Sequence, residues 1–169
     1  DESAAYVTAP GSRRLRTQIA RWMLRGGCTL NPDELIITNG ASEAVFLALQ
    51  VLCKPGDTVA ISSPIYFNFV QMLTLLDLRV IEIPNSPTEG LNLELLEHAC
   101  ATNRIACCVV VSNFDNPMGS SLSDRRKQKL VALATRYQVP LIEDDINGDL
   151  AYDDERTSVA KARDTDGRV

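Results

Sequence analysis

The chain has 169 residues, of which 45% are hydrophobic and 23% are charged, and its formal net charge is −5. This balance is typical of a folded globular domain and excludes a disordered or collagen-like chain. The acidic excess argues against a nucleic-acid surface on this chain, and no apolar run is long enough for a transmembrane helix.

The cysteines show neither a metal-binding nor a disulfide pattern. Five are present without a CxxC pair, together with a single histidine, His98. Cys107 and Cys108 fall inside an apolar run, where a thiol behaves as a small hydrophobic group. We therefore expect a reduced, cytoplasmic protein without a metal centre.

The first predicted elements are a helix and a short strand. Residues 11–25 carry apolar side chains at helical spacing, and a glycine pair ends the pattern. The expected apolar face consists of Leu15, Ile19, Trp22 and Met23. Residues 35–38 predict a short strand.

A glycine-containing turn follows this strand. Gly40 lets the backbone turn tightly before a helix predicted over residues 44–52. The amides of Ala41 and Ser42 would then point out of the helix N-terminus, which carries about half a positive charge and attracts anions. Two interpretations stay open, a phosphate site and a simple N-cap formed by Ser42.

Strands and helices alternate through the middle of the chain. Strands are predicted over residues 58–62 and 79–83, and helices over residues 67–76 and 91–101. Such alternation predicts a three-layer α/β/α sandwich with a mainly parallel sheet. Tyr66, just past the first of these strands, either packs in the core or offers a flat surface to a planar ligand.

The last third predicts a βαβ unit. A buried strand over residues 105–111 leads into a loop that contains Asn116, and Ser123 is a natural N-cap for the next helix. A second strand, residues 139–142, ends at three consecutive carboxylates, of which Asp144 is the second. Because parallel strands end at the same edge of a sheet, we expect Asn116 and Asp144 side by side, where open α/β sheets bind ligands.

Together these groups suit a planar, phosphorylated ring that contains nitrogen. The helix amides would take the phosphate, Tyr66 would stack, Asn116 would donate to a ring oxygen, and Asp144 would keep a ring nitrogen protonated. Pyridoxal phosphate (PLP) needs that last contact to act as an electron sink. The competing ligand is a divalent metal such as Mg²⁺ on carboxylates 143–145, of which at most two can converge because consecutive strand residues face opposite sides.

Six motifs in order match one family. They are Tyr6-(x)4-Gly11-(x)3-Leu15-Arg16, residues 36–41, Pro55-Gly56-Asp57, Pro64-x-Tyr66, Asn116-Pro117-x-Gly119 and Leu141-Ile142-Glu143-Asp144-Asp145. In these motifs the chain resembles the large domain of fold-type I PLP-dependent aminotransferases (class I/II). The resemblance is greatest to the aminotransferase-like domain of the MocR subfamily of GntR transcription regulators.

The resemblance implies a role for each matching residue at the phosphate end of the site. Gly40, Ala41 and Ser42 would bind the cofactor phosphate. Tyr6 would reach the phosphate of the neighbouring subunit in a homodimer. Tyr66 would stack on the ring.

The resemblance also implies roles at the other end of the ring. Asn116 would reach the phenolic oxygen, and Asp144 would pair with the pyridinium nitrogen. Relatives carry a tyrosine two or three residues after this aspartate that also contacts the ring oxygen. This chain has Ile146 and Asn147 at those places, which weakens the expectation of cofactor binding without abolishing it.

The resemblance makes residues 1–169 a part of the large, PLP-binding domain of a longer protein. The lysine that forms the Schiff base would lie shortly past Val169, and the arginine that binds a substrate carboxylate further still. A DNA-binding domain and a small domain would also lie outside this chain. Lys161 is a poor substitute for the lysine, so we expect this chain alone to be catalytically inactive.

Three functions stay open. The chain could belong to a MocR-type regulator, in which PLP and an amino-acid or amine ligand control DNA binding by a separate winged-helix domain. The sequences Glu-Asp-Asp at residues 143–145 and Gly-Asp-Leu at residues 148–150 favour this function. It could belong to a working aminotransferase, which transfers amino groups between amino acids and 2-oxo acids. It could be an interaction domain that has lost its cofactor.

The resemblance also predicts that further strands of the sheet lie outside residues 1–169. Without them the chain would expose a sheet edge and apolar surface, so we expect it to self-associate.

Overall fold

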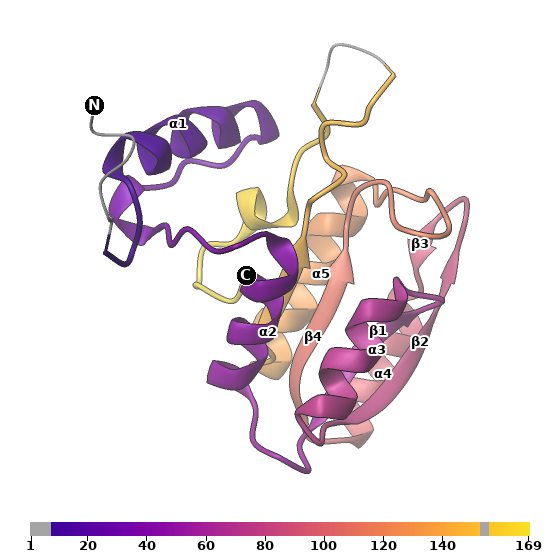
Figure 1. Cartoon of the computed structure of the whole chain (residues 1–169). Coiled ribbons are helices and arrows are strands. Elements are labelled where there is room, and N and C mark those ends of the chain that lie inside the picture. Colours follow the sequence, from indigo (N-terminus) through magenta and orange to yellow (C-terminus); the bar gives the residue numbers. More distant parts are fainter. Residues whose placement is uncertain (1–7, 153–155) are drawn as a thin grey trace.

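The computed structural model describes residues 8–152 and 156–169, and the predicted role of Tyr6 lies outside them. A five-stranded sheet of order β3-β2-β1-β4-β5 lies between helices (Figure 1). The strands are β1 (Thr58–Ser63), β2 (Arg79–Ser86), β3 (Gly90–Leu91), β4 (Ile105–Val111) and β5 (Leu141–Asp144). The helices are α1 (Arg13–Met23), α2 (Ala41–Leu52), α3 (Phe67–Leu75), α4 (Leu93–Thr102) and α5 (Asp124–Tyr137), with 3₁₀ turns η2 (Leu24–Gly26), η3 (Pro32–Glu34) and η4 (Ala160–Arg163).

The predicted three-layer α/β/α sandwich is confirmed. β1 pairs in parallel with both β2 and β4, and β4 pairs in parallel with β5. One antiparallel pair was not predicted: β3 returns along β2, with Asn85 opposite Leu91, where the sequence predicts a loop up to Gly90 and a helix from Leu91. Two residues carry too little periodicity to identify a strand.

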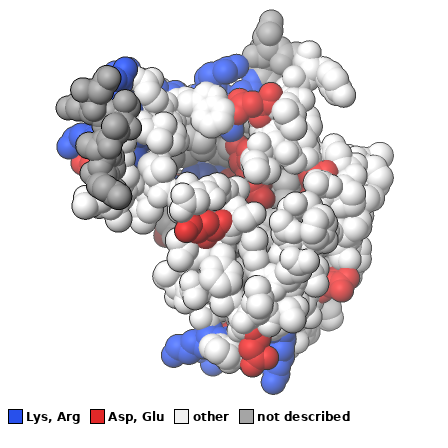
Figure 2. All heavy atoms as spheres, in the orientation of Figure 1, with Lys and Arg blue, Asp and Glu red and all other residues white. Residues whose placement is uncertain are grey.

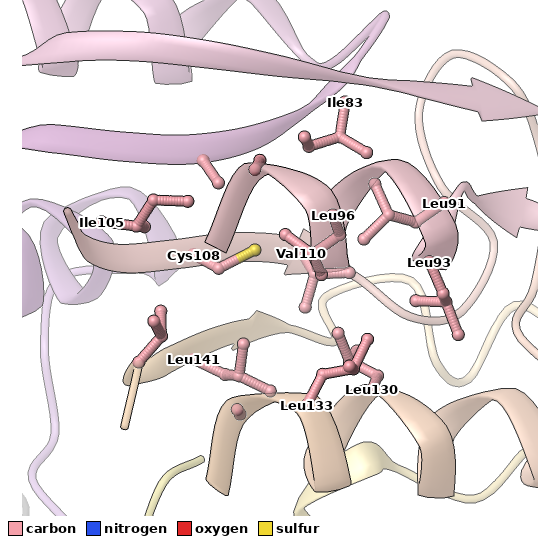
Figure 3. Close-up of a cluster of buried hydrophobic side chains, with 14 of the residues drawn as sticks. Ile83, Leu91, Leu93, Leu96, Ile105, Cys108, Val110, Leu130, Leu133 and Leu141 are labelled. Carbon is pink, nitrogen blue, oxygen red and sulfur yellow. The ribbon is translucent and has the colours of Figure 1, made fainter. Parts of the chain in front are cut away.

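Two apolar cores cover the two faces of the sheet. One lies against α4 and α5 and contains Cys108 and Val110 of β4 (Figure 3). The other lies against α2 and α3 and contains Cys107 and Val109. Because successive residues of β4 enter different cores, the strand is apolar without interruption.

The strand predicted over residues 35–38 is wrong. The amide of Ile37 donates to the carbonyl of Pro10 at 2.9 Å, and Ile36 is 71% exposed. Just before it, Asn31 and Glu34 form a capping box around η3. The backbone here therefore pairs with the N-terminal segment, and within the described residues it does not pair with any strand of the sheet.

The apolar face predicted for α1 is also largely wrong. Leu15 and Trp22 are 46% and 44% exposed, whereas Arg16 and Ala20 are the buried residues of the helix. The Arg16 guanidinium donates to carbonyls of neighbouring loops, 3.2 Å from Gly11 O. An arginine can be buried here because loop backbone, rather than a second apolar surface, lies against the helix.

The surface combines charges of both signs. Among the described residues on the face in Figure 2, acidic side chains lie around the hollow between α1 and the sheet, and lysine and arginine lie mainly at the margins. His98, the single histidine, is exposed. Within the described residues, no helix is both long and apolar enough to cross a membrane.

Candidate functional site

A cavity of about 280 Å³ lies beyond the carboxyl ends of β1, β4 and β5, beside the first turn of α2. Five of the predicted site residues line it: Ala41, Ser42, Tyr66, Asn116 and Asp144. Gly40 directly precedes this lining as the N-cap of α2. The volume is close to the lower end of the range for small-molecule sites.

The start of α2 presents backbone donors to the cavity. Gly40 has φ +91°, a conformation that favours glycine, although a Cβ there would meet no atom within 4 Å. Ala41 and Ser42 are the first two helical residues, and amides at these positions have no acceptor within the helix. The prediction of Ser42 as N-cap is wrong, because the helix begins three residues earlier than expected.

Strand register brings Asp144 to the cavity. Asp144 is paired with Val111, the last residue of β4, and both line the cavity. Burial raises the pKa of the Asp144 carboxyl, the amide of Ile146 (3.0 Å from Oδ1) opposes the rise, and the charge of Asp145 adds to it. A cationic donor in the cavity would favour the ionised carboxylate and offset this burial.

The other two carboxylates of the cluster have protein partners elsewhere. Glu143 accepts from the amides of Ala160 and Lys161 at 2.7 and 2.9 Å. Asp145 forms an ion pair with Arg156, N to O 2.5 Å. The three side chains thus do not converge as a magnesium site requires, and no group of three metal-binding side chains occurs in residues 8–152 and 156–169.

Tyr66 combines the two roles between which the sequence could not choose. It packs against the apolar core on the α2–α3 face, with its ring centroid 4.6 Å from that of Phe67. It also lines the cavity, where its hydroxyl accepts from Nδ2 of Asn68 at 3.2 Å. The ring is therefore held by packing while part of it lines the cavity.

Asn147 is, with Ile146, one of the two positions at which the family resemblance leads us to expect a tyrosine. Its Nδ2 donates to the carbonyl of Phe114 at 2.9 Å, and both Asn147 and its neighbour Ile146 line the cavity. The amide thus connects the segment after β5 to the loop that carries Asn116. A phenol at this position would present a hydroxyl donor where this chain presents a side-chain amide.

Sequence reasoning missed Asp115, which immediately precedes Asn116. It is only 2% exposed, and its Oδ2 accepts from Nδ2 of Asn85, whereas Oδ1 has no partner among the described atoms. Burial raises the pKa of this carboxyl to about 6, and the charge of Asp144 contributes to the rise. An aspartate beside asparagine and proline usually indicates an exposed turn, so the sequence gives no sign of its burial.

Comparison with known proteins gives one consistent result. The family profile "Aminotransferase class I and II" matches residues 1–167. The Escherichia coli "uncharacterized HTH-type transcriptional regulator YjiR" is 42% identical over 97% of this chain and 35% of its own length. The corresponding regulator YdcR of the same organism is 39% identical over 92% of this chain and 33% of its own length. The chain thus spans about a third of these relatives.

A solved structure gives the same architecture. The Pyrococcus horikoshii kynurenine aminotransferase, in complex with PMP, superposes with a TM-score of 0.89 at 28% identity. The match covers 99% of this chain and 43% of the aminotransferase. The similarity therefore extends over both the sheet and the segments that form the cavity.

Proposed function

Because the chain belongs to the aminotransferase class I and II family, we propose that it forms part of a PLP-binding effector domain in a GntR/MocR-type transcription regulator. The observation that carries the cofactor proposal is the convergence of backbone donors, an aromatic ring, an amide and a carboxylate on one cavity. The similarity to two HTH-type regulators supports the regulatory part.

The residues present fit the cofactor. Ala41 and Ser42 would bind its phosphate through amides that the helix leaves without acceptors. Tyr66 would hold the face of the ring, and Asn116 would donate to the ring oxygen. Asp144 fits the ring nitrogen best, since a half-buried carboxylate with a raised pKa is stabilised by a protonated nitrogen beside it.

The cofactor and the protein would have different roles in such a site. When bound, PLP supplies an electron sink for amino compounds. The protein's own groups would bind and orient the cofactor: the start of α2 would hold the phosphate, and Asp144 would keep a proton on the ring nitrogen. Asn147 and the Phe114 carbonyl hold the two loops at the mouth of the cavity together.

The partners proposed for this domain follow the same reasoning. The ligand would be an amino acid or amine, the assembly a homodimer, and DNA would be bound by a domain outside residues 1–169. The second candidate is a working aminotransferase, which the solved kynurenine aminotransferase favours. We also propose that residues 1–169 form part of the large, PLP-binding domain of the longer protein.

The experiment is an absorbance titration of the full natural protein with PLP, followed by a panel of amino acids. A bound chromophore that changes with an amino acid but releases no 2-oxo acid supports the regulator. Stoichiometric release of a 2-oxo acid supports the aminotransferase. Absence of any bound chromophore would contradict the cofactor proposal and leave an interaction domain.

A further inference from the structure

Two thiols from different elements lie in contact. Sγ of Cys53 is 3.5 Å from Sγ of Cys107, although 54 positions separate the residues in sequence. Cys53 is the C-cap of α2, and Cys107 is a fully buried residue of β4. Cys108, the next residue, enters the core on the opposite face of the sheet.

The local structure allows these sulfur atoms to come together. A disulfide requires about 2.05 Å between sulfurs, so an approach of about 1.5 Å is needed. Cys107 is fixed in the sheet by its pairing with Val59. Cys53 has left the helix in an extended conformation and is half-buried, and it borders two surface grooves, so an oxidant can reach its sulfur.

We propose that Cys53 and Cys107 form a reversible dithiol–disulfide site that responds to peroxide. The Cys53 thiolate attacks hydrogen peroxide, breaks the O–O bond and becomes a sulfenic acid, and the departing hydroxide is protonated to water. The sulfur of Cys107 then attacks the sulfur of Cys53, and hydroxide leaves as water with the Cys107 proton. Two thiols and one peroxide give one disulfide and two waters.

The environment of the thiols makes this reaction slow at neutral pH. Burial raises the pKa of both thiols above the ordinary value of 9.0. Because only the thiolate attacks peroxide, the rate should rise about tenfold per pH unit between pH 7 and 9. The site would therefore respond to sustained oxidation rather than to brief exposure.

The bond would connect two elements that line the cavity. α2 carries Ala41 and Ser42 at its start, and β4 ends at Val111 beside Asp144. A bond at the far end of α2 would fix the position of the helix on the central strands. The proposal does not depend on which ligand the cavity binds.

The test is thiol mapping of the full chain after reduction, removal of the reductant and exposure to hydrogen peroxide at pH 8. We expect the loss of two thiols, a mass lower by about 2 Da and a linked peptide containing Cys53 and Cys107, all reversed by dithiothreitol. Cys53→Ser should abolish the link, and this partly exposed position tolerates the change. Cys100→Ser, at another half-buried cysteine, should leave the link intact.

Three outcomes would overturn the proposal. They are two persisting free thiols at saturating peroxide, oxidation of Cys53 to sulfinic acid without a link, and a link between other cysteines. Cys107→Ala, which keeps a small apolar group in β4, provides a second variant: it should retain the fold by circular dichroism and trap Cys53 as a sulfenic acid.

Discussion

Nζ of Lys127 lies 2.7 Å from Oδ1 of Asn113, and both side chains are buried inside the protein. Lys127 belongs to α5 and is fully buried, and its ammonium group also donates to the carbonyl of Ser158 at 2.6 Å. Nδ2 of Asn113 in turn donates to Oδ1 of Asp145 at 2.8 Å. These contacts connect α5, the end of β4, the end of β5 and the segment before η4.

Loss of this ammonium group should destabilise the protein. In Lys127→Met, the acceptors of Asn113 and Ser158 would lose a buried donor, so we expect the free energy of unfolding to fall by about 1–3 kcal/mol for each acceptor that is left unsatisfied. Urea denaturation followed by circular dichroism measures this. Lys129→Met, which removes an exposed ion pair with Glu94, is the matched control and should change stability little. Equal effects of the two substitutions would contradict the assigned role.

The stability should depend on pH through Asp115. Its folded pKa of about 6 lies above the ordinary value of 3.8, so the folded state binds the proton more tightly than the unfolded state. The stabilisation from this group is therefore complete below pH 4 and lost as pH rises through 6. Relative to wild type, Asp115→Asn should become more stable as pH rises from about 4 to about 6, by up to about 1.4 kcal/mol per pH unit, and the difference should level off above about pH 7. A difference that is constant with pH would refute this.

The carboxylate of Asp144 should matter for the cofactor and little for the fold. We expect Asp144→Asn to weaken PLP binding about 10–100-fold in the full natural protein, since a charge-assisted hydrogen bond to the ring nitrogen is lost. Fluorescence titration measures the affinity. The control is Asp145→Asn, which breaks the pair with Arg156 and should reduce stability more than affinity. An Asp144→Asn variant with unchanged affinity would remove the role proposed for this residue.

Arg156 should hold the N-terminal helix against the rest of the molecule. Its guanidinium pairs with Asp145 and Asp149 and lies 4.9 Å from the ring centroid of Trp22, while its side chain is only 2% exposed. Arg156→Met should lower stability by about 3–5 kcal/mol. Trp22 is the only tryptophan, so acrylamide quenching of its fluorescence should increase as α1 loosens. Arg136→Met, at an exposed pair with Glu97, should affect neither measurement.

The sequence was most informative where a run of residues is compatible with a single local structure. β4 was predicted with its observed bounds because an almost unbroken apolar run rich in β-branched residues is typical of a buried strand. The meeting of Asn116 and Asp144 at one cavity followed from the parallel direction of β4 and β5. Ser123 was predicted as the N-cap of α5, and its hydroxyl accepts from the amide of Arg126.

The sequence was least informative for polar residues that become buried. Nothing in the pattern distinguishes Lys127 from Lys129, the exposed lysine of the same helix, or Arg16 from the other arginines of α1. Their burial depends on acceptors that come from distant segments, such as the carbonyls of Ser158 and Pro32. Local periodicity contains no information on such partners.

The position of β1 between β2 and β4 has a consequence for how the chain folds. β1 pairs first along the sequence with β2, but its other edge pairs with β4, so that Thr58 lies opposite Ile105. For β1 to pair with β4, the chain must close a loop that contains the β2–β3 hairpin and α4. The entropic cost of closing a loop grows with its length. The centre of the sheet, and with it the cavity, should therefore form late in folding, and refolding should be slower than for a helical domain of equal length.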